Sequence, residues 1–196
     1  VAIAQENLKR MLAYSAIAHI GYALLGLSAG TATAYAMSLF YLLAYGLMAL
    51  TAFGLLVVVS KSGQVEAIND LRGLNARSPW LALVMLLAMF SMAGIPPTVG
   101  FFAKLGILLG LIGADQLWMA TLAIIFAIIG AYYYLNVIKV MYFEEPEPTL
   151  PRLMVAPDAY LALSINAILL LVLGLFPSQL MELAQTAFFT INHPVY

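Results

Sequence analysis

The sequence predicts an all-α membrane protein, a polytopic bundle of five transmembrane helices that forms a single membrane domain over residues 1–196. Apolar residue types make up 64% of the chain and charged types only 9%, whereas soluble domains average about 45–50% and about 25%. The mean hydropathy of +1.00 is too high for a water-covered surface on a chain of this size. The apolar residues also fall into runs long enough to cross a bilayer.

The composition excludes several functional classes. The 8 basic and 9 acidic residues leave a net charge of −1, which argues against a disordered chain and against a nucleic-acid partner. There is no cysteine, so this chain makes no disulfide, thiolate metal site or iron–sulfur cluster. It has neither a glycine-rich phosphate loop nor an HExxH motif. We therefore expect this chain to bind no metal and no cofactor, and to be surrounded by lipid.

The first two expected spans lie close to the N-terminus. The chain starts Val1–Ile3 without an initiator methionine or a signal peptide, which we interpret as the cut edge of a longer protein. The first span covers about residues 11–27. The second covers about residues 33–60, which is long enough to tilt in the bilayer. A polar segment, residues 61–77, separates it from the third span.

Prolines mark the ends of the fourth and fifth spans. The acidic segment Glu144–Pro148 ends the fourth span, because its prolines prevent a continuous helix. Pro177 ends the fifth span, and residues 181–191 are expected to form an amphipathic helix at the membrane interface. The third, fourth and fifth spans are expected at about residues 79–113, 117–143 and 159–176.

Basic residues are confined to alternate connectors between the spans. Short loops rich in lysine and arginine stay in the cytoplasm. Seven basic residues fall on one side of the membrane, and the turns and tail on the other side contain none. This difference predicts a cytoplasmic N-terminal edge and a periplasmic C-terminus in a bacterial inner membrane. The eighth basic residue, Lys104, lies within the third span. The other seven, all on the predicted cytoplasmic side, are Lys9, Arg10, Lys61, Arg72, Arg77, Lys139 and Arg152.

The third span carries a helix-breaking sequence near its middle. Its length of about 35 residues would make a helix of roughly 50 Å, although the hydrocarbon core is only about 30 Å thick. Two consecutive prolines remove two backbone donors, so we expect the helix to stop near Gly94 and restart near residues 97–98. Irregular backbone at this depth is tolerated where it faces protein or a wet cavity. A proline kink in a packing helix is the alternative. The residues of the expected break are Gly94, Pro96, Pro97 and Gly100.

Lys104 is the first candidate functional residue. It lies eleven residues before Asp115, the first charge on the outer side, and eleven residues of helix rise about 16 Å. Lys104 is therefore expected near the bilayer midplane, where a lysine costs at least about 2.5–3.5 kcal/mol and marks a functional site by default. Its stem is too short to reach either surface. A lysine in a buried wet cavity can take up and release a proton.

His19 is the second candidate. It lies nine residues past Arg10, about 13 Å into the first span. Imidazole titrates near neutrality and suits a proton relay, although a neutral histidine bonded between helices is the alternative. A second hypothesis is that a polar path for protons runs along this face of the first span and along the fourth span. The alternative is that the residues of this path only pack between helices. Its candidate residues are Ser15, Tyr132, Tyr133 and Asn136.

Two long motifs carry a family resemblance. The segment Asn7–Tyr22, which reads NLKRMLAYSAIAHIGY, and the segment Ser91–Lys104, which reads SMAGIPPTVGFFAK, resemble signatures of the antiporter-like subunits of respiratory complex I, the bacterial NADH:quinone oxidoreductase. The resemblance covers essentially the whole chain. The AHIGY form and the segment Tyr132–Leu135 are most similar to the members classed as subunit N.

The resemblance implies more than the residues alone. It implies the tenth to fourteenth of fourteen helices, the C-terminal part of a proton-translocating subunit. Lys104 then matches the lysine of a broken helix assigned to the outer proton half-channel, and His19 matches a histidine of the polar chain along the membrane centre. A glutamate and lysines of the earlier helices are absent here, so this part is not expected to pump alone.

The same resemblance implies an enzyme complex around the chain. NADH, FMN, iron–sulfur clusters and quinone would be bound by partner subunits of the electron transport chain, with no redox site in this chain. Other membrane subunits of complex I would be its partners. Two alternatives remain: a subunit of a related Na⁺/H⁺ antiporter or membrane-bound hydrogenase complex, and a structural bundle that conducts nothing.

Overall fold

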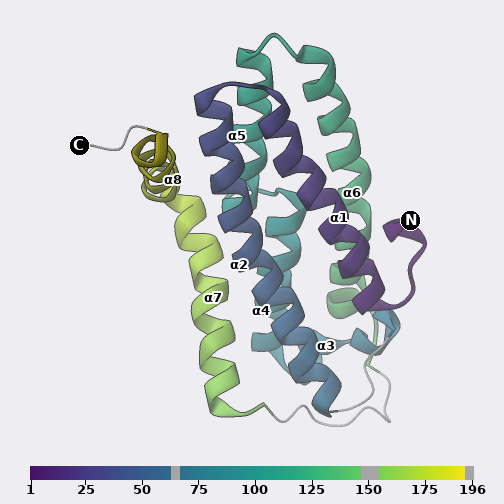
Figure 1. Cartoon of the computed structure of the whole chain (residues 1–196). Coiled ribbons are helices and arrows are strands. Elements are labelled where there is room, and N and C mark those ends of the chain that lie inside the picture. The colour runs from purple at the N-terminus through teal and green to yellow at the C-terminus, as the bar shows by residue number, and fades with distance from the viewer. Residues whose placement is uncertain (63–66, 147–154, 193–196) are drawn as a thin grey trace.

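The computed structural model describes residues 1–62, 67–146 and 155–192. The described residues form helices and turns with one isolated bridge between Asn7 and Ala67, so the predicted all-helical class is confirmed (Figure 1). The elements in chain order are η1 (Ala2–Ala4), α1 (Leu8–Ser28), α2 (Ala32–Ser62), η2 (Ile68–Leu71), α3 (Leu74–Arg77), α4 (Pro79–Ala93), α5 (Val99–Gly113), α6 (Leu117–Phe143), α7 (Pro157–Leu175) and α8 (Pro177–Asn192).

Four helices of the described chain are long and apolar enough to cross a membrane. They are α1, α2, α6 and α7, and they correspond to the first, second, fourth and fifth predicted spans. Helices α4 and α5 are also apolar but have only 15 residues each. Together they occupy the segment in which the sequence predicts the third span.

The long helices run alongside one another, with α2 in a central position (Figure 1). Helix α2 contacts α1, α4, α5, α7 and α8. Its inward side chains include Phe40, Tyr41 and Met48, which are almost completely buried. Helix α8 turns away from the direction of α7 after Pro177 (Figure 1). It spans the segment predicted as an amphipathic helix.

The connection from α4 to α5 is an ordered turn of irregular backbone. Gly94 ends α4 in the left-handed conformation, with φ at 84°, which glycine adopts without steric cost. The Thr98 hydroxyl donates to the Ile95 carbonyl over 2.7 Å. The Gly100 amide donates to the Ser91 hydroxyl over 3.1 Å. These bonds satisfy a carbonyl of the turn and one of the first amides of α5, which has no partner within its own helix.

Protein also covers this irregular backbone. A Cβ atom at Gly174 of α7 would overlap the backbone of Pro97 and Thr98, and a Cβ atom at Gly100 would overlap the Ser91 carbonyl. Two glycines therefore allow α7 and α4 to approach the turn closely. Since unsatisfied backbone is costly in lipid, this packing explains how a helix bundle can hold the turn.

Most basic residues gather at one end of the bundle, as the connectors predict. That end holds the start of α1, the connector from η2 to α4, and the end of α6 (Figure 1). The Arg72 Nε atom pairs with Glu144 Oε2 over 2.8 Å, which ties the connector to the end of α6. The turns at residues 29–31 and 114–116, at the other end, contain no lysine or arginine. Arg152 and the side chain of Lys61 lie outside the described part of the structure.

Candidate functional site

Lys104 lies in the second turn of α5 and its amine reaches back to the end of α4. The Nζ atom donates to the carbonyls of Met92 and Ala93 over 2.8 and 2.9 Å. These are among the last carbonyls of α4, which have no partner within their own helix. A cation at a helix C-terminus also interacts favourably with the helix dipole. Lys104 therefore caps α4 across the break.

Two neighbours shape the position of the Lys104 side chain. A Cβ atom at Gly94 would lie 2.8 Å from Lys104 Cδ. Gly94 therefore leaves room for the lysine side chain, in addition to allowing the left-handed backbone turn. On the other side, Lys104 Nζ lies 5.6 Å from the centre of the Tyr22 ring of α1. This separation is within the range of a cation–π interaction. The lysine is therefore held between the break and α1.

His19 is buried in the middle of α1 and bonds two other helices. Its Nδ1 atom lies 2.8 Å from the Tyr41 hydroxyl of α2, and its Nε2 atom lies 2.9 Å from the Tyr134 hydroxyl of α6. The Tyr45 ring stacks on the imidazole with centres 4.6 Å apart. A neutral imidazole has one donor and one acceptor nitrogen. One tyrosine therefore donates to His19 while the other accepts from it.

The Tyr134 hydroxyl is the branching point of this network. It lies 2.5 Å from the Ser15 hydroxyl and 3.4 Å from the Tyr133 hydroxyl, in addition to its contact with His19. A phenol has one proton to donate, so Tyr134 cannot donate to all its neighbours at once. The direction of its O–H bond therefore depends on which nitrogen of His19 carries the proton.

A small cavity connects the two candidate residues. It has a volume of about 30 Å³ and is lined by both His19 and Lys104, together with Tyr22, Tyr133 and Tyr134. A site of about 10–15 Å³ with polar partners is enough for one water molecule. A larger hollow of about 320 Å³ reaches Lys104 from between α5 and α6. The arrangement can therefore hold water between a lysine and a histidine inside the bundle.

The structure brings together several of the residues that the sequence singles out, and separates others. Lys104, His19 and Tyr133 line the small cavity, Ser15 belongs to the hydrogen-bond network beside it, and Gly94 lies against the Lys104 stem. In contrast, Tyr132 is 62% exposed. Tyr132 and Asn136 are not among the residues lining the small cavity. The break residues Pro96, Pro97 and Gly100 shape the backbone behind Lys104.

Sequence reasoning missed four tyrosines of this site. Tyr134 belongs to the segment Tyr132–Leu135 but is not among the predicted path residues. Tyr22 follows His19 by three positions, and Tyr41 and Tyr45 are four positions apart, so each pair shares a helix face. This spacing of tyrosines within apolar runs is the sequence feature that could have identified them as site residues. Among the described residues, no group of three or more His, Cys, Asp or Glu side chains could hold a metal ion.

Comparison with known sequences places the chain in a family. A family model described as NADH:quinone oxidoreductase/Mrp antiporter, transmembrane, matches residues 1–130. NADH-quinone oxidoreductase subunit N of Thioalkalivibrio sulfidiphilus is 53% identical over 188 residues, covering 95% of this chain and 39% of that protein. The subunit N of Coxiella burnetii is 51% identical with the same coverage. The chain thus spans about two fifths of the length of these relatives.

Solved structures give the same relationship. A chain of respiratory complex I from Thermus thermophilus with bound NADH aligns with a TM-score of 0.81 and 29% identity, over 95% of this chain and 40% of that chain. A chain of the Mrp complex from Dietzia sp. DQ12-45-1b aligns with a TM-score of 0.89 and 22% identity, over 99% of this chain and 44% of that chain, which establishes the shared fold. With two thirds of its length matched by the family model, this chain belongs to the NADH:quinone oxidoreductase/Mrp antiporter transmembrane family.

Proposed function

We propose that this chain is the C-terminal part of a proton-translocating membrane subunit of an NADH:quinone oxidoreductase. Lys104 and His19 carry protons, while the redox chemistry takes place in other subunits. The observation that carries this proposal is the small, partly open cavity that both residues line. The relatives at 53% and 51% identity, both named NADH-quinone oxidoreductase subunit N, support the choice of complex.

The proposal includes five membrane crossings in one domain, with α4 and α5 together as the third. Two helices of 15 residues end to end span about 45 Å, comparable with about 46 Å for the 31 residues of α2. The break then falls near the middle of the bilayer. With the basic end of the bundle in the cytoplasm, the C-terminus lies in the periplasm of a bacterial cell.

In the proposed transfer, water in the small cavity links the Lys104 amine to the Tyr134 and His19 side chains. A proton that arrives at Nε2 of His19 makes the imidazole doubly protonated while Nδ1–H donates to the Tyr41 hydroxyl, and the Nε2 proton later returns to the water through the Tyr134 hydroxyl. His19 thereby stores a proton between its uptake and its release. Charges in the rest of the subunit would change the proton affinity of Lys104 and so couple this site to its neighbours.

The partners in this proposal are the other membrane subunits of the complex. They and the peripheral subunits supply the sites for NADH, FMN, iron–sulfur clusters and quinone. Purification of the native membrane complex through a tag on the full-length protein is expected to yield NADH:quinone oxidoreductase activity. Sodium-dependent proton exchange without NADH oxidation in the same preparation would contradict the proposal and favour an antiporter complex.

Replacing Tyr134 with phenylalanine is expected to lower proton translocation per electron several-fold while the complex still assembles. The substitution removes the hydroxyl that lies between His19 Nε2 and Ser15 and keeps the ring. Proton uptake by NADH-energised membrane vesicles measures the effect. Tyr132→Phe is the matched control, because that tyrosine is 62% exposed on the same helix. Equal proton yields in both variants would show that the Tyr134 hydroxyl has no part in transfer.

A further inference from the structure

Tyr22 of α1 lies where three spaces within the bundle meet. It lines the small cavity beside His19, the hollow of about 320 Å³ between α5 and α6 (the α5–α6 hollow), and an apolar groove of about 790 Å³ between α1 and α6. No other residue in the described part of the chain lines all three. Tyr22 is nevertheless only 8% exposed. Its ring therefore forms part of the wall that separates these spaces.

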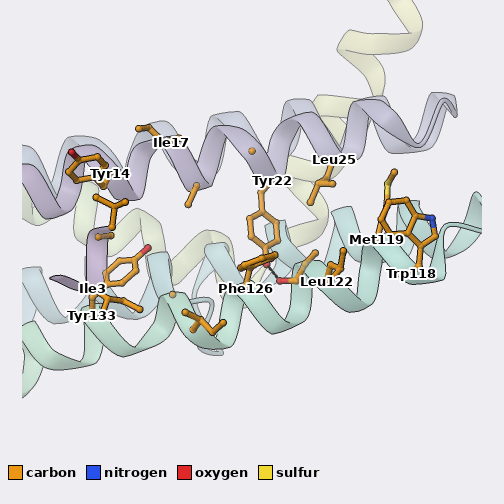
Figure 2. A pocket seen from close by; sticks show the side chains of 17 residues that line it. Ile3, Tyr14, Ile17, Tyr22, Leu25, Trp118, Met119, Leu122, Phe126 and Tyr133 are labelled. Atoms are coloured by element: carbon orange, nitrogen blue, oxygen red, sulfur yellow. Dashed lines mark hydrogen bonds between the residues drawn. The ribbon is translucent and has the colours of Figure 1, made fainter. Parts of the chain in front are cut away.

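The Tyr22 side chain reaches from α1 across to α6. Its hydroxyl donates a hydrogen bond to the Ala123 carbonyl of α6, which Figure 2 shows as a dashed line. A carbonyl oxygen has two lone pairs, so Ala123 can accept this bond in addition to one within its own helix. The Tyr22 ring also stacks on the ring of Tyr41 of α2, with centres 5.8 Å apart and an interplanar angle of 7°. Contacts with two other helices therefore hold the ring in this position.

The small cavity and the α5–α6 hollow share a narrow boundary. Three residues line both spaces, namely Tyr22, Lys104 and Ala127. The Lys104 amine is anchored by the carbonyls of Met92 and Ala93, and Ala127 presents only a methyl group. Of the three, Tyr22 therefore carries the large group whose displacement would join the two spaces.

The charge of Lys104 acts on this ring. Lys104 Nζ lies 5.6 Å from the centre of the Tyr22 ring, which is within the range of cation–π attraction. The other titratable side chains that line the two spaces are His19, Tyr133 and Tyr134, and no carboxylate of the described residues lines either space. A neutral amine lacks the charge that attracts the ring. Loss of the Lys104 proton therefore removes one of the contacts that hold Tyr22 in place.

We propose, on the basis of the function proposed above, that Tyr22 closes the boundary between the small cavity and the α5–α6 hollow while Lys104 is charged, and releases it when Lys104 gives up its proton. Tyr22 is then a positioning residue that acts through Lys104. A continuous chain of water past the lysine is interrupted as long as the lysine holds its proton. Protons therefore pass through Lys104 rather than around it, which preserves the gradient.

Passive proton leak through the assembled complex tests this role in the full-length protein. A pH gradient is imposed across sealed inverted vesicles without NADH, and its decay is followed with a pH-sensitive dye and divided by the amount of assembled complex. Tyr22→Leu removes the ring and is expected to raise this leak several-fold. Tyr22→Phe keeps the ring but loses the bond to Ala123, so its leak should lie between those of the wild type and the leucine variant.

Tyr14→Leu is the matched control. Tyr14 lies on the same helix and lines the apolar groove, but it lines neither the small cavity nor the α5–α6 hollow. This variant is expected to leak like the wild type. A purely structural role of Tyr22 would lower the amount of assembled complex without raising the leak per complex.

Wild-type leak in every Tyr22 variant that assembles would overturn the proposal, and so would an equal rise in Tyr14→Leu. The phenylalanine variant keeps the buried ring, so it decides the test even if leucine prevents assembly. Lys104→Met in the same vesicles distinguishes this failure from failure of the proposed function. Loss of NADH-driven translocation in Lys104→Met, without leak in the Tyr22 variants, would refute only the role of Tyr22. Unchanged translocation in Lys104→Met would refute the proposed function itself.

Discussion

Replacing Lys104 with methionine in the complete enzyme is expected to lower NADH-driven proton translocation roughly tenfold or more, since a positioned proton-transfer group typically contributes at least that much. Methionine fills a similar volume but carries no proton. It also leaves the carbonyls of Met92 and Ala93 without their donor. Quenching of a pH-sensitive dye in inverted membrane vesicles measures the loss. Wild-type acidification at a wild-type rate of NADH oxidation would contradict a role for Lys104 in proton transfer.

The capping role of Lys104 requires its own control. Lys104→Gln keeps amide N–H donors directed toward the end of α4 but cannot ionise. If Lys104 only caps the helix, glutamine should restore assembly and translocation together. We expect glutamine to restore assembly relative to methionine while translocation stays low. Quantifying the assembled complex on native gels separates the two effects.

Replacing His19 with glutamine is expected to reduce proton translocation several-fold, the second largest effect after Lys104. A glutamine side chain offers a donor and an acceptor to the tyrosines on either side, but it cannot take up a proton. His19→Leu is a harsher change, because it removes the partner of the buried Tyr41 hydroxyl at a cost of about 1–3 kcal/mol and one of the partners of Tyr134. We expect leucine to reduce assembly as well.

Proton yield per electron in vesicles separates the role of His19 in transfer from its role in packing. A glutamine variant that assembles and translocates protons like the wild type would identify His19 as a packing residue alone. Loss of translocation in step with loss of assembled complex, for both variants, would lead to the same conclusion.

The helices were largely predictable because the bilayer imposes a length on apolar runs. The run that begins near Met11 becomes α1, and the run that ends near Phe143 becomes α6. The limits of the α4–α5 connection follow from local chemistry. Two prolines deprive the helix of donors and Gly94 permits the left-handed turn, so α4 ends at Ala93 and α5 begins at Val99.

The partners of His19 were not predictable in the same way. Tyr41 lies 22 residues from His19 and Tyr134 lies 115 residues away, and helix periodicity does not say which faces of distant helices meet. The tyrosine run illustrates this. Consecutive residues of a helix point in directions about 100° apart, so residues 132–134 cannot all face one site. Packing buries Tyr133 and Tyr134 and leaves Tyr132 at 62% exposure.

The capping contact of Lys104 could not be predicted from the sequence either. Residue counting predicts a depth in the bilayer, and for Lys104 it predicts a position near the midplane. Its contact with Met92 and Ala93 depends on how α5 is displaced relative to α4 by the turn between them. The close approaches at Gly174 of α7 and Gly100 of α5 accompany that displacement, and no local pattern reveals them.

If Lys104 works by taking up and releasing a proton, the Lys104→Arg variant should not translocate protons normally. Arginine keeps the positive charge and the N–H donors at the end of α4, but it does not deprotonate in proteins. The measurement is the number of protons translocated per NADH oxidised by the assembled complex in sealed vesicles. The account predicts an assembled complex with a proton yield well below that of the wild type. A wild-type yield with arginine would contradict it, because a permanent charge would then be sufficient.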